Sequence, residues 1–126
     1  MIYVYFSFSG DSDILALSVQ QLRRADPSAT IWVANDNSAP AAVPAGCKEI
    51  RTRYPRGEHG TGNGLPAVQG ELEVFRYIRE QEKASHLVKV DSDVWVRDVS
   101  LIRPGFTVQE GLPEPDFVAC EGSRAL

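Results

Sequence analysis

Two aspartates, Asp91 and Asp93, follow a short apolar segment, His86–Val90, that is expected to form a strand. Ligands in open α/β sheets bind beyond the carboxyl ends of the strands. Carboxylates two residues apart can there reach one hard cation, and Mg²⁺ usually takes one or two carboxylates together with phosphate oxygens. We therefore predict that Asp91-Ser92-Asp93 binds Mg²⁺ or Mn²⁺ and that a diphosphate completes the coordination. The alternative is that Asp91 caps a turn while Asp93 is solvated.

A further acidic residue, Asp36, stands at the end of another expected strand, within the run Ala34–Ser38. A carboxylate in this position can accept hydrogen bonds from a ribose or from the edge of a base. Asn and Asp also favour Asx turns, in which the side chain bonds to the backbone two residues further on. From this stretch alone the two interpretations are equal. Asp98, in contrast, is interpreted as a loop or N-cap residue.

A glycine-rich stretch, Arg56–Gly64, precedes an expected helix. Glycines let backbone N–H groups approach an anion closely, and a helix N-terminus attracts negative charge. The stretch contains neither the Gly-x-Gly-x-x-Gly dinucleotide fingerprint nor a Walker A motif, so anion binding and a plain connecting loop both stay open. His59 in this loop is interpreted as solvated. The cluster of Arg51, Arg53 and Arg56 either pairs with diphosphate charge or belongs to a solvated edge strand.

The hydrophobic pattern places these residues on alternating strands and helices. Apolar and β-branched runs predict strands over Ile2–Phe8, Thr30–Ala34, Lys48–Arg53, His86–Val90 and Phe117–Cys120. Because a helix separates the first two strands, we expect them to be parallel, and we expect the third to lie at a sheet edge. The stretch Asn35–Gly46 is expected to be a loop. The predicted fold class is therefore α/β, a Rossmann-like, mostly parallel sheet flanked by helices.

Two helices are expected between the strands. The first, Ile14–Arg24, carries apolar residues at 15, 19 and 22 on one face, and either Asp11 or Ser12 is its expected N-cap. The second is a long helix with one apolar stripe, predicted to consist of Leu65, Val68, Leu72, Phe75 and Ile78.

Length and composition limit what the chain can be. Its 126 residues are 43% hydrophobic and 24% charged, which suits a single globular domain over 1–126. The formal net charge of −4 gives no reason to expect nucleic acid as a partner. The longest apolar run, Ile2–Phe6, is too short to span a bilayer, so no transmembrane segment is expected. Cys47 and Cys120 lie far apart without metal-ligand spacing, which favours a cytoplasmic protein without disulfides or zinc.

Taken together, these segments resemble the amino-terminal, nucleotide-sugar-binding half of the A-fold (GT-A) glycosyltransferases with an Asp-x-Asp signature. In that family a strand and helix precede a second strand that ends in an acidic turn, and a loop and helix precede the strand that bears the signature. The corresponding segments here, in the same order, are Tyr3–Ser9, Ile31–Ser38, Asn63-Gly64 with the helix after it, Lys89–Asp93 and Phe117–Cys120.

The resemblance implies a role for individual residues. Asp93 would bind the metal directly, and Asp91 would contact the metal or the donor ribose. Asp36 would bind the base or ribose. The nucleotide pocket would be lined by Ser7, Ser9 and Asn63. The metal would neutralise the diphosphate leaving group of a nucleotide-diphospho-sugar donor. The acceptor-binding half of the family is expected to be absent, and no catalytic residue is assigned.

Two other functions stay open. The first is a non-catalytic nucleotide- or metal-binding module, or a degenerate, oligomer-forming relative. The second, less favoured, is a haloacid-dehalogenase-like phosphatase with Asp91 as nucleophile and Asp93 as acid and base, since Trp95 and the late position of the motif depart from that pattern. If Phe117–Cys120 is the last strand, its open edge favours a homo-oligomer.

Overall fold

The computed structural model describes residues 1–52 and 65–100. In this part of the chain the elements are β1 (Ile2–Ser7), a 3₁₀ helix η1 (Ser9–Asp11), α1 (Ser12–Ala25), β2 (Thr30–Asp36), β3 (Lys48–Thr52), α2 (Leu65–Glu82) and β4 (Val88–Asp91). The predicted strand Phe117–Cys120 lies outside the described residues. No helix in the two described stretches is long and apolar enough to cross a membrane.

Four parallel strands form one sheet in the order β3-β2-β1-β4. β1 pairs with β2 from Ile2↔Thr30 to Ser7↔Asn35, and with β4 from Tyr3↔Val88 to Phe6↔Asp91. The predicted α/β class, the parallel pairing of the first two strands and the edge position of the third are therefore confirmed for the described part of the chain.

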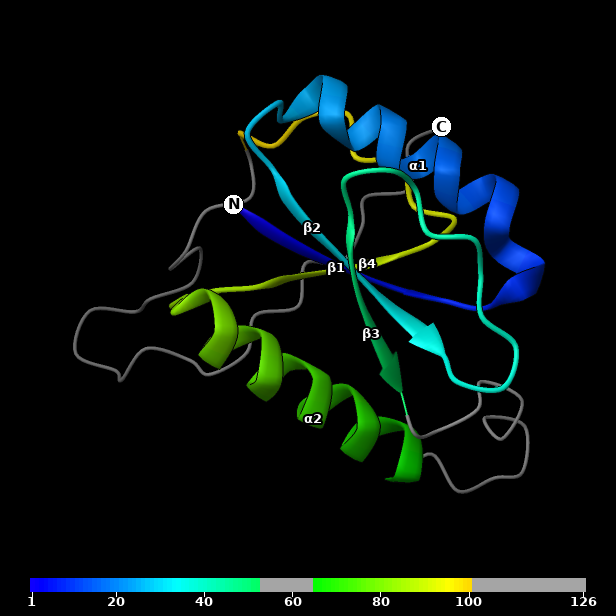
Figure 1. The fold of residues 1–126 in the computed structure, drawn as a ribbon. Helices are drawn as coiled ribbons and strands as arrows, with labels where there is room; N and C mark the ends of the chain where they lie inside the picture. The colour runs from blue at the N-terminus through cyan, green and yellow to red at the C-terminus, as the bar shows by residue number, and fades with distance from the viewer. Residues whose placement is uncertain (53–64, 101–126) are drawn as a thin grey trace.

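The two helices cover opposite faces of this sheet (Figure 1). Because successive strand residues point to opposite faces, β1 supplies both cores. Tyr3 and Tyr5 pack on the α1 face with Leu15, Val19 and Leu22, as the spacing of α1 predicted. On the α2 face the buried residues are Val4, Trp32, Ala34, Val74 and Ile78.

The strand ends differ from the predicted ones. β1 stops at Ser7 rather than Phe8, β2 continues to Asp36, and β4 begins at Val88. Pairing with neighbouring strands sets these limits, because β2 keeps a partner in β3 as far as Asp36↔Thr52. The pairing of β4 with β1 begins at Val88, which lies opposite Tyr3. The predicted strand start at His86 is therefore wrong.

The apolar stripe predicted for α2 is also wrong in part. Val74 and Ile78 are the buried apolar side chains described for α2, and Phe75 is half-buried against the same core. In contrast, the side chains of Val68 and Leu72 are 53% and 57% exposed. Glu71 already reaches β4, the last strand of the described sheet, through an ion pair with Lys89. Val68 and Leu72 therefore have no described strand to pack against. The side chain of Leu65 lies outside the described part of the structure.

Candidate functional site

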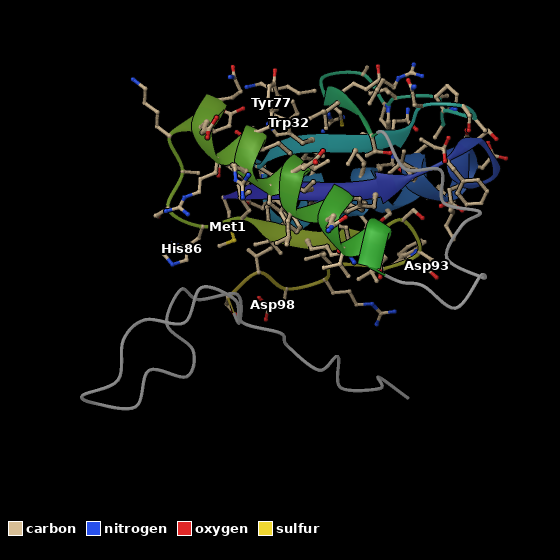
Figure 2. The ribbon with its side chains drawn as sticks, turned by 90° about the horizontal axis from the view of Figure 1, so that it is seen from below. Met1, Trp32, Tyr77, His86, Asp93 and Asp98 are labelled. Carbon is tan, nitrogen blue, oxygen red and sulfur yellow. The ribbon has the colours of Figure 1, made fainter. Side chains whose placement is uncertain are left out.

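The order of the strands reverses between β1 and β4. The chain runs from β1 through α1 to β2 on one side, and later returns through α2 to β4 on the other side. The segment that leaves β1 enters α1, and the segment that leaves β4 also contacts α1, through Ser18 and Val94. Open α/β sheets commonly bind ligands at the carboxyl ends of strands beside such a reversal. Figure 2 shows Asp93 at this end of the sheet, far from Met1 and His86. The sequence-predicted residues Ser7 and Asp91 end the two strands beside this reversal.

The turn after β4 presents two exposed carboxylates on either side of a buried serine. Asp91 and Asp93 are exposed, and Ser92 is only 2% exposed. The backbone N–H of Val94 donates to the carbonyl oxygen of Asp91 at 3.0 Å. It is thus the backbone of Asp91 that closes the turn, while its carboxylate lies 3.8 Å from Lys89 Nζ, which also contacts Glu71.

Ser92 connects this turn to the beginning of α1. Its hydroxyl donates to Asp11 Oδ2 at 2.6 Å, although the two residues lie 81 positions apart. Asp11 does stand at the N-cap position of α1, but its side chain makes no capping hydrogen bond, so the predicted capping role of this side chain is wrong. Ser12 does not precede the helix but is its first residue, and its hydroxyl donates to Ser9 O. The sequence did not identify Asp11 as a site residue, because an aspartate just before a helix is sufficiently explained as an N-cap.

The turn makes a second contact with α1 through Ser18, a fully buried residue of that helix. Its hydroxyl donates to the carbonyl oxygen of Val94 at 2.5 Å and lies 3.2 Å from the Tyr5 hydroxyl oxygen. Burial raises the pKa of Tyr5, because it disfavours the ionised phenolate. The turn is therefore attached to α1 both at Ser92 and at Val94.

The predicted pocket residues Ser7 and Ser9 have different surroundings. Ser7 is 4% exposed, and its Oγ has no hydrogen-bond partner among the described residues. A buried hydroxyl without a partner is unusual, and a bound ligand or water is one way to satisfy it. Ser9 is exposed, and its backbone N–H donates to Ala39 O at 2.7 Å.

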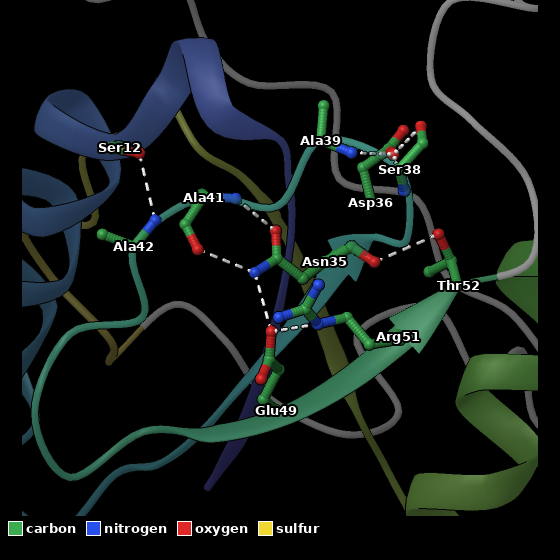
Figure 3. Close-up of polar contacts among 10 residues, drawn as sticks. All are labelled: Ser12, Asn35, Asp36, Ser38, Ala39, Ala41, Ala42, Glu49, Arg51 and Thr52. Carbon is green, nitrogen blue, oxygen red and sulfur yellow. Dashed lines mark hydrogen bonds and ion pairs between the residues drawn. The ribbon is translucent and has the colours of Figure 1, made fainter.

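Asp36 forms the Asx turn that was one of its two interpretations. Its Oδ1 accepts from the backbone N–H and the hydroxyl of Ser38 and from the N–H of Ala39, at 2.7–2.9 Å (Figure 3). A role of Asp36 in binding a base or ribose stays a prediction. The turn lies close to the end of β1, because Ser9 bonds to Ala39.

The neighbouring Asn35 is fully buried and holds the loop after β2 (Figure 3). Its side-chain amide donates to Ala41 O and to Glu49 Oε1, both at 2.9 Å, and accepts from Ala41 N at 2.7 Å. Thr52 Oγ1 donates to the backbone carbonyl of Asn35 at 3.3 Å. The sequence did not indicate this difference between Asn35 and Asp36, since both residue types suit a turn.

The donor chemistry of the site suits a hard cation. Asp91 and Asp93 offer exposed carboxylate oxygens, which Mg²⁺ and Mn²⁺ prefer. In residues 1–52 and 65–100 no group of three or more His, Cys, Asp or Glu side chains could hold a metal ion. Two carboxylates are nevertheless sufficient where phosphate oxygens complete the coordination. The residues present therefore fit a cation that is shared with a diphosphate, and not one held by protein ligands alone.

The remaining candidates are either separate from this site or not described. Asp98 is exposed and lies away from Asp93 (Figure 2), and its carboxylate accepts from the N–H of Ser100. Hydrogen bonds from Ser100 lower the pKa of Asp98. Arg51 forms an ion pair with Glu49 at 2.6 Å. The predicted residues outside the described ranges are Asn63, His59, Arg53, Arg56 and the rest of the glycine-rich stretch.

In comparisons with protein-family models, curated proteins and solved structures, nothing matches this chain.

Proposed function

We propose that this chain is a glycosyltransferase-like domain that binds a nucleotide-diphospho-sugar through a divalent cation, Mn²⁺ or Mg²⁺. One observation carries the proposal: the exposed carboxylates of Asp91 and Asp93 lie at the end of β4, beside the point where the strand order reverses. In a fold of the GT-A kind this is where the Asp-x-Asp signature binds the donor. The proposal also rests on the sequence resemblance given above.

Each residue has a defined role in this proposal. Asp93 binds the cation, and Asp91 binds the cation or the donor ribose. When bound, the cation neutralises the charge that develops on the diphosphate leaving group. The buried hydroxyl of Ser7 contacts the nucleotide, and the turn of Asp36 with Ser9 borders the base or ribose. We further propose a cytoplasmic location from the cysteine usage, and a homo-oligomer from the predicted edge strand.

Calorimetric titration with UDP- and GDP-sugars, with and without Mn²⁺, tests the proposal. We expect binding that requires Mn²⁺ and that weakens at least about tenfold in Asp93→Ala, because a direct ligand is lost. Asp98→Ala is the matched control, since it removes an exposed carboxylate that lies away from the site. Absence of nucleotide-sugar binding under every condition, or equal losses in both variants, would overturn the proposal.

A second measurement separates an enzyme from a binding module. Release of free sugar from the bound donor by this chain indicates catalysis, whereas binding without release favours the non-catalytic alternative. Hydrolysis of an aryl phosphate without any nucleotide-sugar binding would instead support the phosphatase alternative.

A further inference from the structure

The turn that carries Asp91 and Asp93 is attached to α1 at two points. Ser92 donates to Asp11 Oδ2 at 2.6 Å, and Ser18 donates to Val94 O at 2.5 Å. These contacts stand on either side of Asp93 in the sequence. The side chain of Asp93 is exposed. Of its two sequence neighbours, Ser92 is buried, whereas Val94 has an exposed side chain and is bonded to Ser18 through its carbonyl oxygen.

The acceptor of the first contact is itself held in place. The backbone N–H of Asp11 donates to Phe8 O at 2.9 Å. The preceding residue, Gly10, packs so closely on the ring of Phe8 that a Cβ atom there would lie 2.8 Å from Phe8 Cε2. Asp11 is therefore connected to the end of the central strand β1 through a short and tightly packed segment. A hydrogen bond from Ser92 to this carboxylate links the turn to β1 as well as to α1.

The position of Asp11 suits support of the turn better than direct binding of the cation. Its Oδ2 already accepts from Ser92, and no three acidic, His or Cys side chains converge among the described residues. A cation that binds a turn must otherwise restrict the turn's motion, which costs conformational entropy. Where hydrogen bonds restrict the turn beforehand, this cost does not weaken binding.

We propose that Asp11 is a positioning residue of the cation site, acting through the Ser92 hydroxyl to hold the Asp91–Val94 turn in its binding geometry. This inference rests on the proposed function, because it assumes that the turn binds a divalent cation. Asp11 sets the affinity for the cation without contacting it. The hydrogen bond, and not the negative charge of Asp11 alone, carries this effect.

Mn²⁺ affinity, measured by electron paramagnetic resonance of the free ion, tests the inference in the presence of UDP. We expect about a tenfold loss in Asp11→Ala and in Ser92→Ala, the lower end of what supporting residues contribute at metal sites. The double variant should lose no more than either single variant, because both remove one and the same contact. Asp13→Ala is the matched control, since Asp13 is an exposed carboxylate in the first turn of α1.

Two further measurements separate positioning from a general loss of structure. Asp11 is only half-buried, so we expect Asp11→Ala to keep the wild-type circular dichroism spectrum even if Ser92→Ala does not fold. Amide hydrogen exchange of the cation-free protein should rise at Asp93 and Val94 in Asp11→Ala and stay unchanged at Val33 in the core. Ser92→Thr keeps the hydroxyl and should keep the affinity within about threefold.

The possible outcomes distinguish this inference from the proposed function. If wild type binds Mn²⁺ and Asp11→Ala binds it within twofold, the positioning role is wrong while the cation site stands. An equal loss in Asp13→Ala would assign the effect to charge and also overturn the inference. If wild type takes up no Mn²⁺ with or without UDP, both the inference and the proposed function are wrong.

Discussion

Asn35 offers a sharp test of how the carboxyl edge of the sheet is built. Its fully buried amide makes three hydrogen bonds, two of them to the backbone of Ala41, which is 5% exposed. In Asn35→Ala the N–H and the carbonyl of Ala41 lose their partner inside the protein. Each unsatisfied buried group costs about 1–3 kcal/mol, so we expect the free energy of unfolding to fall by about 2–5 kcal/mol. This is a large part of the roughly 5–15 kcal/mol of a typical domain.

Urea unfolding followed by circular dichroism measures this loss, and the melting temperature should fall by roughly 10 °C. Asn37→Ala is the matched control, because Asn37 is exposed and follows two positions later. We expect it to change the free energy of unfolding by less than about 0.5 kcal/mol. A loss below 1 kcal/mol in Asn35→Ala would refute the view that this amide holds the loop after β2.

Three further predictions concern residues away from the site. Burial, and then the hydrogen bond to Asp26, raise the pKa of Tyr3 above its usual range, so the folded state keeps the neutral phenol. The stability that Tyr3 contributes is therefore fully present below pH about 10 and is lost as Tyr3 ionises in the unfolded chain. Between pH 9 and about 11, the free energy of unfolding measured in urea should fall less in Tyr3→Phe than in wild type. The pKa of Asp26 is lowered, chiefly by the Ser28 hydroxyl, so its contribution is present above pH about 4 and is lost on acidification. The stability difference between wild type and Asp26→Asn should therefore shrink between pH 6 and about 2.5, and a constant difference would contradict this linkage. Gly46 has φ of +76°, and a Cβ there would lie 3.1 Å from Arg23 Nη2, so Gly46→Ala should cost about 1–2 kcal/mol in thermal or urea unfolding.

Several parts of the fold could be predicted because they depend on neighbours in the sequence. The buried face of α1 follows from the spacing of Leu15, Val19 and Leu22, and the structure confirms it. The same reasoning failed for Val68 and Leu72, which have the right spacing but are exposed. Periodicity shows which residues share a helix face, but the strands available to that face decide which of them become buried.

The candidate site divides in the same way. The position of Asp91 and Asp93 after an apolar strand was visible in the sequence, and the structure places them at the end of β4. The contact between Ser92 and Asp11 could not be predicted, because nothing in the linear chain relates residues 81 positions apart. A single N-cap preference explained Asp11 adequately until its side chain was found to bond elsewhere.

By itself the sequence determined the alternation of apolar strands with amphipathic helices, and therefore an α/β protein with acidic residues at its strand ends. Local hydrophobic spacing and short-range turn chemistry are sufficient for this. Only the tertiary structure decided the order β3-β2-β1-β4, which makes β1 and β4 neighbours and brings Ser7, Asp11 and the Asp91–Val94 turn to one edge. Strand order depends on which long-range pairings bury both faces of the central strand, and that is a property of the folded chain as a whole.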